Sequence, residues 1–63
     1  MNVKIRRLIQ NLSQKELAKI VGVSNVTLVK IEKGNIDNVK LGTLKKIAAA
    51  LGSNVSELFL SEN

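Results

Sequence analysis

The chain has 63 residues, with ten Lys or Arg against five Asp or Glu, a formal charge of +5, and neither Cys nor His. Its length suits one small domain, 1–63, and the missing residue types exclude disulfides, thiolate metal sites and the commonest general base. The positive excess favours a nucleic-acid partner, although many small domains are basic for solubility alone. With no Trp or Tyr, binding of single strands by base stacking is disfavoured.

The first predicted helix covers residues 2–11. Apolar residues recur there at i, i+3, i+4 and i+7, which predicts one face turned toward a core. That face consists of Ile5, Leu8, Ile9 and Leu12. The other positions carry Lys4, Arg6 and Arg7.

Two short helices are predicted next, over residues 14–21 and 25–33. Ser13 can cap the first, and its spacing to Glu16 is that of a capping box. Gly22 ends this helix because glycine enters the left-handed conformation without penalty. Ser24 caps the second helix, and Gly34 ends it in the same way.

The apolar positions of this segment can all point into one core, with Ala18 where a crossing helix needs a small side chain. They are Leu17, Val21, Val23, Leu28 and Ile31. Two helices that meet steeply across a glycine-containing turn form the helix-turn-helix of DNA-reading proteins.

The remainder of the chain predicts a loop and two further helices. Residues 35–40 are rich in turn formers. Residues 41–51 form a helix whose apolar face is Leu44, Ile47, Ala48 and Leu51. A last helix begins at Ser53 or Asn54 and runs to Leu60. The expected fold is all-α, with five helices and no strand.

These residues resemble the lambda-repressor-like (Cro/cI, or XRE) family over nearly the whole chain. The matching features are Leu12-Ser-Gln14, Glu16-Leu17-Ala18, Gly22-Val23-Ser24, Thr27-Leu28, Ile31-Glu32-Lys-Gly34 and Thr43-Leu44-Lys-Lys-Ile47-Ala48-Ala-Ala-Leu51. The resemblance implies a compact five-helix DNA-binding domain that regulates transcription.

Helix 25–33 is the expected recognition helix. If Leu28 and Ile31 are buried, its outward residues are Asn25, Val26, Val29, Lys30 and Lys33. The Asn25 amide can pair with adenine, Val26 can pack on a thymine methyl, and Lys30 can reach guanine or a phosphate. The resemblance places these three on base-reading positions. The alternatives are that Asn25 is only a polar first-turn residue, that Val26 belongs with Val29 to a wider apolar face, and that Lys30 is an ordinary solvated lysine.

Contacts to the DNA backbone are expected from the start of helix 14–21. There the free N–H groups and the positive dipole end suit a phosphate, and the family's matching Gln grips the backbone at the position of Gln14. The alternative is an exposed Gln that caps its own helix. Further backbone candidates are Lys15, Thr27, Lys33, Asn35 and Lys40. Asp37 departs from the family pattern and would repel a phosphate, so the middle of its loop is not expected on DNA.

Arg7 and Glu32 are expected to pair. A carboxylate near a helix C-terminus is disfavoured by the dipole, so Glu32 needs a local cation, and an Arg fork suits a partly buried pair. The resemblance implies the same pairing. The alternative is two independent solvated charges.

Taken together, the sequence predicts a cytoplasmic, sequence-specific regulator that binds double-stranded DNA as a homodimer. Two units about 34 Å apart would read a near-palindrome. The candidate dimer surface is Leu58, Phe59 and Leu60, unless the first two close the core. No catalytic residue, metal, cofactor, small-molecule ligand or membrane contact is expected.

Three other classes of protein compete with this interpretation. An antitoxin or another protein-binding module is the main alternative. A cationic membrane-surface helix fits poorly with three glycine-marked helix stops. An enzyme is disfavoured by the lack of His and Cys and of an evident carboxylate pair.

Overall fold

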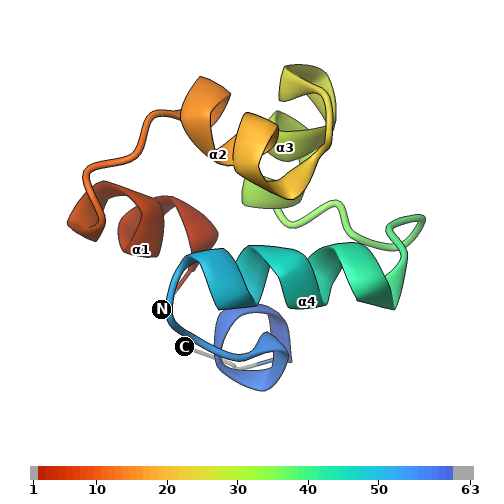
Figure 1. Cartoon of the computed structure of the whole chain (residues 1–63). Coiled ribbons are helices and arrows are strands. Elements are labelled where there is room, and N and C mark those ends of the chain that lie inside the picture. Colours follow the sequence, from red (N-terminus) through yellow and green to blue (C-terminus); the bar gives the residue numbers. More distant parts are fainter. Residues whose placement is uncertain (1, 61–63) are drawn as a thin grey trace.

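Helices make up the regular structure of residues 2–60, the part of the chain that this computed structural model describes. They are α1 (Val3–Ile9), α2 (Gln14–Val21), α3 (Asn25–Glu32), α4 (Leu41–Ala50) and a short π-helix, η1 (Ser56–Leu60). Among the described residues there is no strand, so the all-α prediction is confirmed. Figure 1 shows α2 and α3 above α4, with η1 beneath α4.

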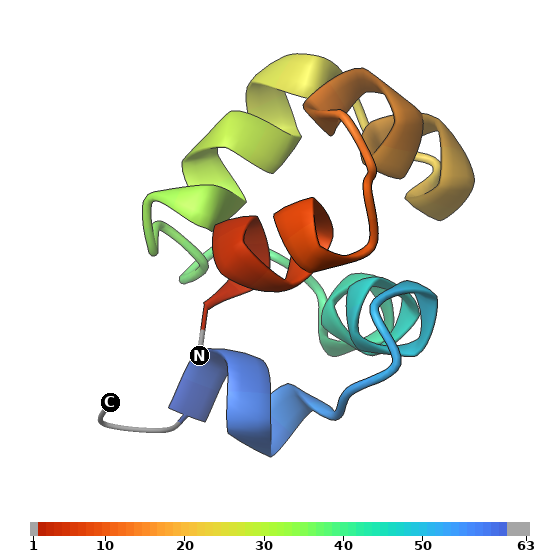
Figure 2. The same cartoon turned by 90° about the vertical axis from the view of Figure 1, so that its left-hand side faces the viewer.

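The core lies where α2, α3 and α4 meet. α2 packs against both α3 and α4, while α1 packs against α3. The most deeply buried side chains are Leu17, Leu28, Ile31, Ile47 and Leu51. Ala18 is also buried in α2, where a small residue allows the helices to approach. In Figure 2, α1 faces the viewer, with α2 and α3 above it and η1 below.

α2 begins and ends where the sequence predicts. The Ser13 hydroxyl accepts from the Glu16 backbone N–H at 3.0 Å, and the Glu16 carboxylate accepts from the Ser13 N–H at 2.8 Å. These bonds hold the pKa of Glu16 below its ordinary value, with the backbone N–H of Ser13 as the larger cause. At the other end Gly22 has φ +86°, the left-handed conformation that turns the chain toward α3.

α3 and α4 are each one residue shorter than predicted, because Lys33 and Leu51 are their C-caps and not their last helical residues. Ser24 caps α3 through its hydroxyl, which accepts from the Thr27 N–H at 3.1 Å. α4 begins after Lys40, whose side chain makes no capping bond. Its predicted apolar face is confirmed, since Leu44, Ile47 and Ala48 are buried on it.

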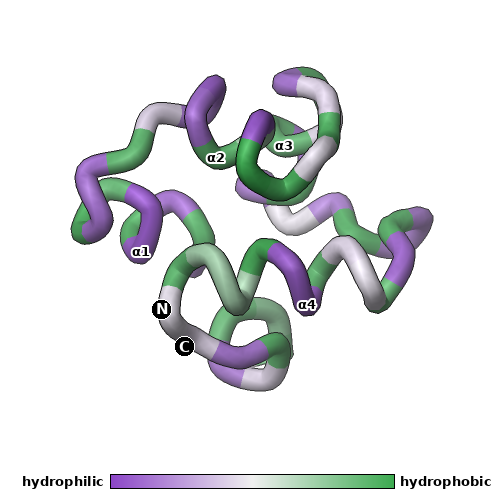
Figure 3. The backbone as a smooth tube through the Cα atoms, viewed as in Figure 1, coloured by the Kyte–Doolittle hydropathy of each residue, from purple (hydrophilic) through white to green (hydrophobic). Residues whose placement is uncertain are grey.

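The predicted buried face of α1 is wrong. Ile5, Leu8 and Ile9 are 46%, 55% and 58% exposed, and the buried residues of α1 are Val3 and Arg7. Figure 3 shows hydrophobic residues along α1 as well as along α4, so hydropathy alone does not separate the two helices. Leu12 lies beyond the end of α1 and packs against the core.

α1 turns its polar side inward because that side has hydrogen-bond partners there. The Arg6 guanidinium donates to the Gly52 carbonyl at 2.9 Å, and the Gln10 amide donates to the Leu51 carbonyl at 3.5 Å. Arg7, on the same side, reaches Glu32 of α3. The helix is also shorter than predicted, because Asn11 adopts a left-handed φ of +60° and turns the chain toward α2.

None of the helices within residues 2–60 has the length and hydropathy that a membrane span requires.

Candidate nucleic-acid interface

The outer face of α3 carries the three residues expected to read bases. Leu28 and Ile31 are buried on the inner side, and Asn25, Val26 and Lys30 are exposed. Val26 is 66% exposed, so it does not belong to a wider buried face. Val29 is half-buried and lies at the edge of the exposed strip. The face therefore presents an amide, an isopropyl group and an ammonium group to the outside.

Asn25 is the first residue of α3, but it is not its cap. The N-cap is Ser24, whose hydroxyl accepts from the Thr27 N–H and donates to the Thr27 hydroxyl at 2.9 Å. The amide of Asn25 is consequently not required for capping. A helix start of this kind is the part of a recognition helix that comes nearest to base edges in the major groove.

A polar cavity of about 360 Å³ lies along one flank of α3. It is lined by Thr27, Lys30, Gly34, Asn35, Asp37, Asn38 and Val39. Three predicted DNA contacts, Thr27, Lys30 and Asn35, therefore lie around one hollow. Asp37 also lines it, which puts a negative charge beside them.

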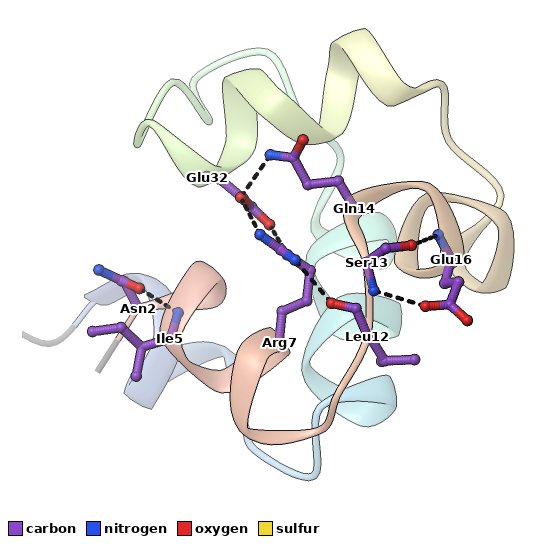
Figure 4. A network of polar contacts seen from close by, with 8 residues as sticks. All are labelled: Asn2, Ile5, Arg7, Leu12, Ser13, Gln14, Glu16 and Glu32. Atoms are coloured by element: carbon purple, nitrogen blue, oxygen red, sulfur yellow. Dashed lines mark hydrogen bonds and ion pairs between the residues drawn. The ribbon is translucent and has the colours of Figure 1, made fainter.

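A buried polar network joins the starts and ends of three helices (Figure 4). The Arg7 Nε donates to Glu32 Oε2 at 2.7 Å, and its Nη2 donates to Oε1 at 3.4 Å. The Arg7 Nη1 donates to the Leu12 carbonyl at 2.8 Å. The two charged side chains are only 8% and 5% exposed. Arg7 and Glu32 thus lie together as expected, and they hold α1 against α3.

Gln14 takes part in the same network, which sequence reasoning missed. Its Nε2 donates to Glu32 Oε1 at 2.9 Å, and the residue is half-buried. An amide nitrogen carries two N–H donors, so the bond to Glu32 leaves one for another acceptor. The only signal in the sequence was that Glu32 has more acceptor sites than one arginine fills.

The start of α2 still has backbone donors to offer. The capping box uses the N–H groups of Ser13 and Glu16. Within residues 2–60, those of Gln14 and Lys15 have no acceptor. Free N–H groups at a helix N-terminus favour an anion. Lys15 and Lys40 are exposed and are not among the residues that line the cavity beside α3.

The C-terminal residues predicted to form a dimer surface are mostly part of the core. Leu58 is 7% exposed, and Phe59 is partly buried against the core cluster. Leu60 alone of the three is exposed, at 68%. Leu58 is therefore not available for a contact between subunits.

One family profile and one known protein match nearly the whole chain. The family profile described as "Helix-turn-helix" matches residues 3–58. An uncharacterized HTH-type transcriptional regulator of Methanocaldococcus jannaschii is 40% identical over 62 residues, which cover 97% of this chain and 91% of the relative. No solved structure gave a significant match.

Two further relatives match only in part. A candidate antitoxin, HigA3, of Mycobacterium tuberculosis is 35% identical over 52 residues, or 82% of this chain and 48% of that protein. The glutamine–fructose-6-phosphate aminotransferase of M. jannaschii is 33% identical over 52 residues, again 82% of this chain but 5% of the enzyme. The chain thus spans less than half of each of these proteins.

Proposed function

The chain belongs to the XRE-type helix-turn-helix family of DNA-binding proteins, and from this premise we propose that it is a sequence-specific regulator of transcription. In this proposal α3 lies in the major groove of double-stranded DNA. The observation that supports it is the outer face of α3, where a largely exposed Val26 stands between the amide of Asn25 and the cation of Lys30. An exposed valine in such a place is explained by contact with a thymine methyl.

The proposed contacts divide into two kinds. Asn25, Val26 and Lys30 read base edges, because a bidentate amide, an apolar group and an ammonium match adenine, thymine and guanine. The remaining candidates contact phosphates and position the protein without reading sequence. They are Gln14, Lys15, Thr27, Lys33, Asn35 and Lys40.

We further propose that two copies act together on a near-palindromic operator of the Cro/cI kind. One α3, eight residues long, reads only a few base pairs, and two copies about 34 Å apart would read half-sites one helical turn apart. Leu60 is the exposed apolar residue near the C-terminal end of the described chain. Because Leu58 and Phe59 pack into the core, the rest of the interface between the two copies must come from residues that the sequence did not predict.

Selection of bound sites from random duplex DNA, followed by sequencing, tests this function. We expect enrichment of one motif with half-sites about ten base pairs apart, centre to centre. Asn25→Ala should cost about 1–3 kcal/mol on that motif and relax the preference at one base, whereas Lys33→Ala should weaken all sites about equally. Flat enrichment with the unaltered protein would contradict the proposal.

The salt dependence of binding gives a second readout. Each phosphate neutralised contributes about −0.9 to the slope of log K against log salt concentration. With roughly three phosphate contacts per subunit, a dimer should show a slope near −5. An affinity that is unchanged between low and physiological salt would contradict an electrostatic DNA interface.

A second candidate function is that of an antitoxin or another protein-binding module. Two observations favour it: the similarity to the candidate antitoxin HigA3, and the exposed apolar residues Ile5, Leu8 and Ile9 of α1. A neighbouring gene for a growth-inhibiting protein, together with a stable complex of the two purified products, would support this function. Site selection with the complex would then show whether DNA binding remains.

A further inference from the structure

We propose that a cleft between α1, α2 and α3 holds a phosphodiester group of one DNA strand, and that Lys4 of α1 is one of its cationic ligands. The inference rests on the proposed function, because it takes duplex DNA as the ligand. It adds the first helix to an interface that the sequence predicted from α2, α3 and the following loop alone.

The cleft has a volume of about 290 Å³ and is lined by Lys4, Gln14, Val29, Glu32 and Lys33. A water molecule occupies about 30 Å³ in the liquid, so the cleft has room for a phosphate group and part of the adjoining sugars. Its walls come from three different helices. Figure 4 shows the side chains of Gln14, Glu32 and Arg7 converging between these helices.

The position of the cleft relative to α3 matches the path of a DNA strand. Val29 and Lys33, one helical turn apart, border this cleft, and Thr27 and Lys30 border the cavity on the other flank. A helix in the major groove, which is about 12 Å wide, has a sugar–phosphate backbone on either side. Each flank of α3 therefore has one hollow that can receive one backbone.

The charge of the cleft favours an anion despite the carboxylate in its wall. Glu32 is neutralised by Arg7, with Nε at 2.7 Å from Oε2, and its Oε1 accepts from the Gln14 amide at 2.9 Å. Lys4 and Lys33 are left as the uncompensated charges of the lining. Both are exposed, so a phosphate can reach them directly from the solvent.

The same arrangement gives Arg7 a second role. Removing its guanidinium would uncover the negative charge of Glu32 beside the bound phosphate, whereas Glu32→Gln would remove that charge. Arg7 acts through Glu32 and is a positioning residue, while Lys4 and Lys33 touch the ligand directly.

The test compares Lys4→Gln with Lys46→Gln, which makes the same change of charge on α4. Lys46 is exposed and projects from the side of α4 opposite to its buried residues. Affinity is measured by fluorescence anisotropy over a range of salt concentrations, on the selected operator and on an unrelated duplex. Circular dichroism and thermal unfolding check that each variant is folded, which the exposure of Lys4 favours.

We expect Lys4→Gln to make the salt slope less negative by about 0.9 per subunit. At 0.1 M salt this slope corresponds to an affinity about eightfold lower for each lysine–phosphate pair that is removed, on both duplexes alike. Lys4→Arg should keep the slope of the unaltered protein, and Lys46→Gln should leave it unchanged. If Lys4 had only a structural role, Lys4→Gln would lower the stability of the fold without this change in the salt slope.

Two outcomes overturn the inference, and they are distinguishable. If Lys4→Gln and Lys46→Gln behave alike on a protein that binds its operator, the cleft does not hold the backbone, while the proposed function stands. If the unaltered protein shows no preference and no salt-dependent binding, the proposed function fails and the inference fails with it.

Discussion

Helices α1 and α4 carry apolar stripes of the same spacing, yet only α4 buries its stripe. In α4 the buried residues are Leu44, Ile47 and Ala48. In α1 the corresponding stripe is turned outward, and Arg7 is buried at 6% exposure. The difference shows that periodicity identifies a face of a helix but not the direction in which that face points.

The direction is decided by partners on other helices. Apart from an exposed Leu41, the rest of α4 consists of lysines, a threonine and small residues, so burying the stripe costs no hydrogen bond. α1 has Arg6 and Arg7 on its inner side, and they donate to the Gly52 carbonyl and to Glu32. Gln10, the exposed residue that caps its C-terminal end, reaches the Leu51 carbonyl. A buried arginine without its carboxylate would be strongly unfavourable, and this outweighs the exposure of a few aliphatic groups.

Breaking the buried pair of α1 should have the largest effect. Arg7→Met leaves Glu32 without its cation, and removing one partner of a buried pair costs about 3–5 kcal/mol. That loss approaches the whole stability of a domain of this size, roughly 3–9 kcal/mol at 0.05–0.15 kcal/mol per residue. Urea denaturation of Arg7→Met, Glu32→Gln and the double variant measures it.

The double variant decides whether the two side chains interact. We expect it to be more stable than Arg7→Met alone, because it leaves no uncompensated carboxylate. Additive losses, with a coupling below about 0.3 kcal/mol, would show that Arg7 is not what turns α1 inward.

The same isoleucine-to-alanine change should have very different effects on stability in α4 and in α1. Ile47 of α4 is fully buried and Ile9 of α1 is 58% exposed. Ile47→Ala should cost about 2–5 kcal/mol, because it removes buried apolar surface and leaves a cavity. Ile9→Ala should stay within about 0.5 kcal/mol. Similar losses in the two unfolding curves would contradict the orientation of α1.

The starts of the two helices differ as well. The Asn2 side chain caps α1, accepting from the Ile5 N–H at 2.9 Å, whereas Lys40 makes no side-chain cap for α4. Asn2→Ala should therefore cost about 1 kcal/mol, while Lys40→Ala should cost almost nothing. Thermal unfolding of both variants checks this, and an Asn2→Ala variant as stable as the unaltered protein would mean that the Asn2 cap contributes nothing.

Local signals account for what the sequence predicted correctly. Ser13, Glu16 and Gly22 lie within a few residues of the helix they begin or end, so the bounds of α2 follow from capping and from the left-handed glycine. The core positions of α3 and α4 follow from periodicity because their polar neighbours face solvent.

Contacts between distant residues account for the rest. The bond from Gln14 to Glu32 spans 18 positions and that from Arg6 to Gly52 spans 46. The cleft at Lys4 forms only when three helices meet. No local sequence pattern encodes contacts between residues so far apart in the chain. The outward face of α1 and the lining of the cleft are therefore seen only in the folded structure.

The outward stripe of α1 offers the smallest expected effect and a sharp test of the comparison. Leu8 is 55% exposed and Leu44 of α4 is 7% exposed. Gln has nearly the helix propensity of Leu, so a Leu→Gln change isolates burial from helix formation. At Leu44 the amide would be buried without hydrogen-bond partners, and the free energy of unfolding should fall by several kcal/mol.

At Leu8 the amide stays in water, so the free energy of unfolding should change by at most about 0.5 kcal/mol at low protein concentration. A loss above about 1 kcal/mol there would mean that the stripe is buried in the single chain, as periodicity alone predicts. A loss that appears only as the protein concentration rises would show instead that a second copy covers the stripe, because association stabilises the folded state by mass action.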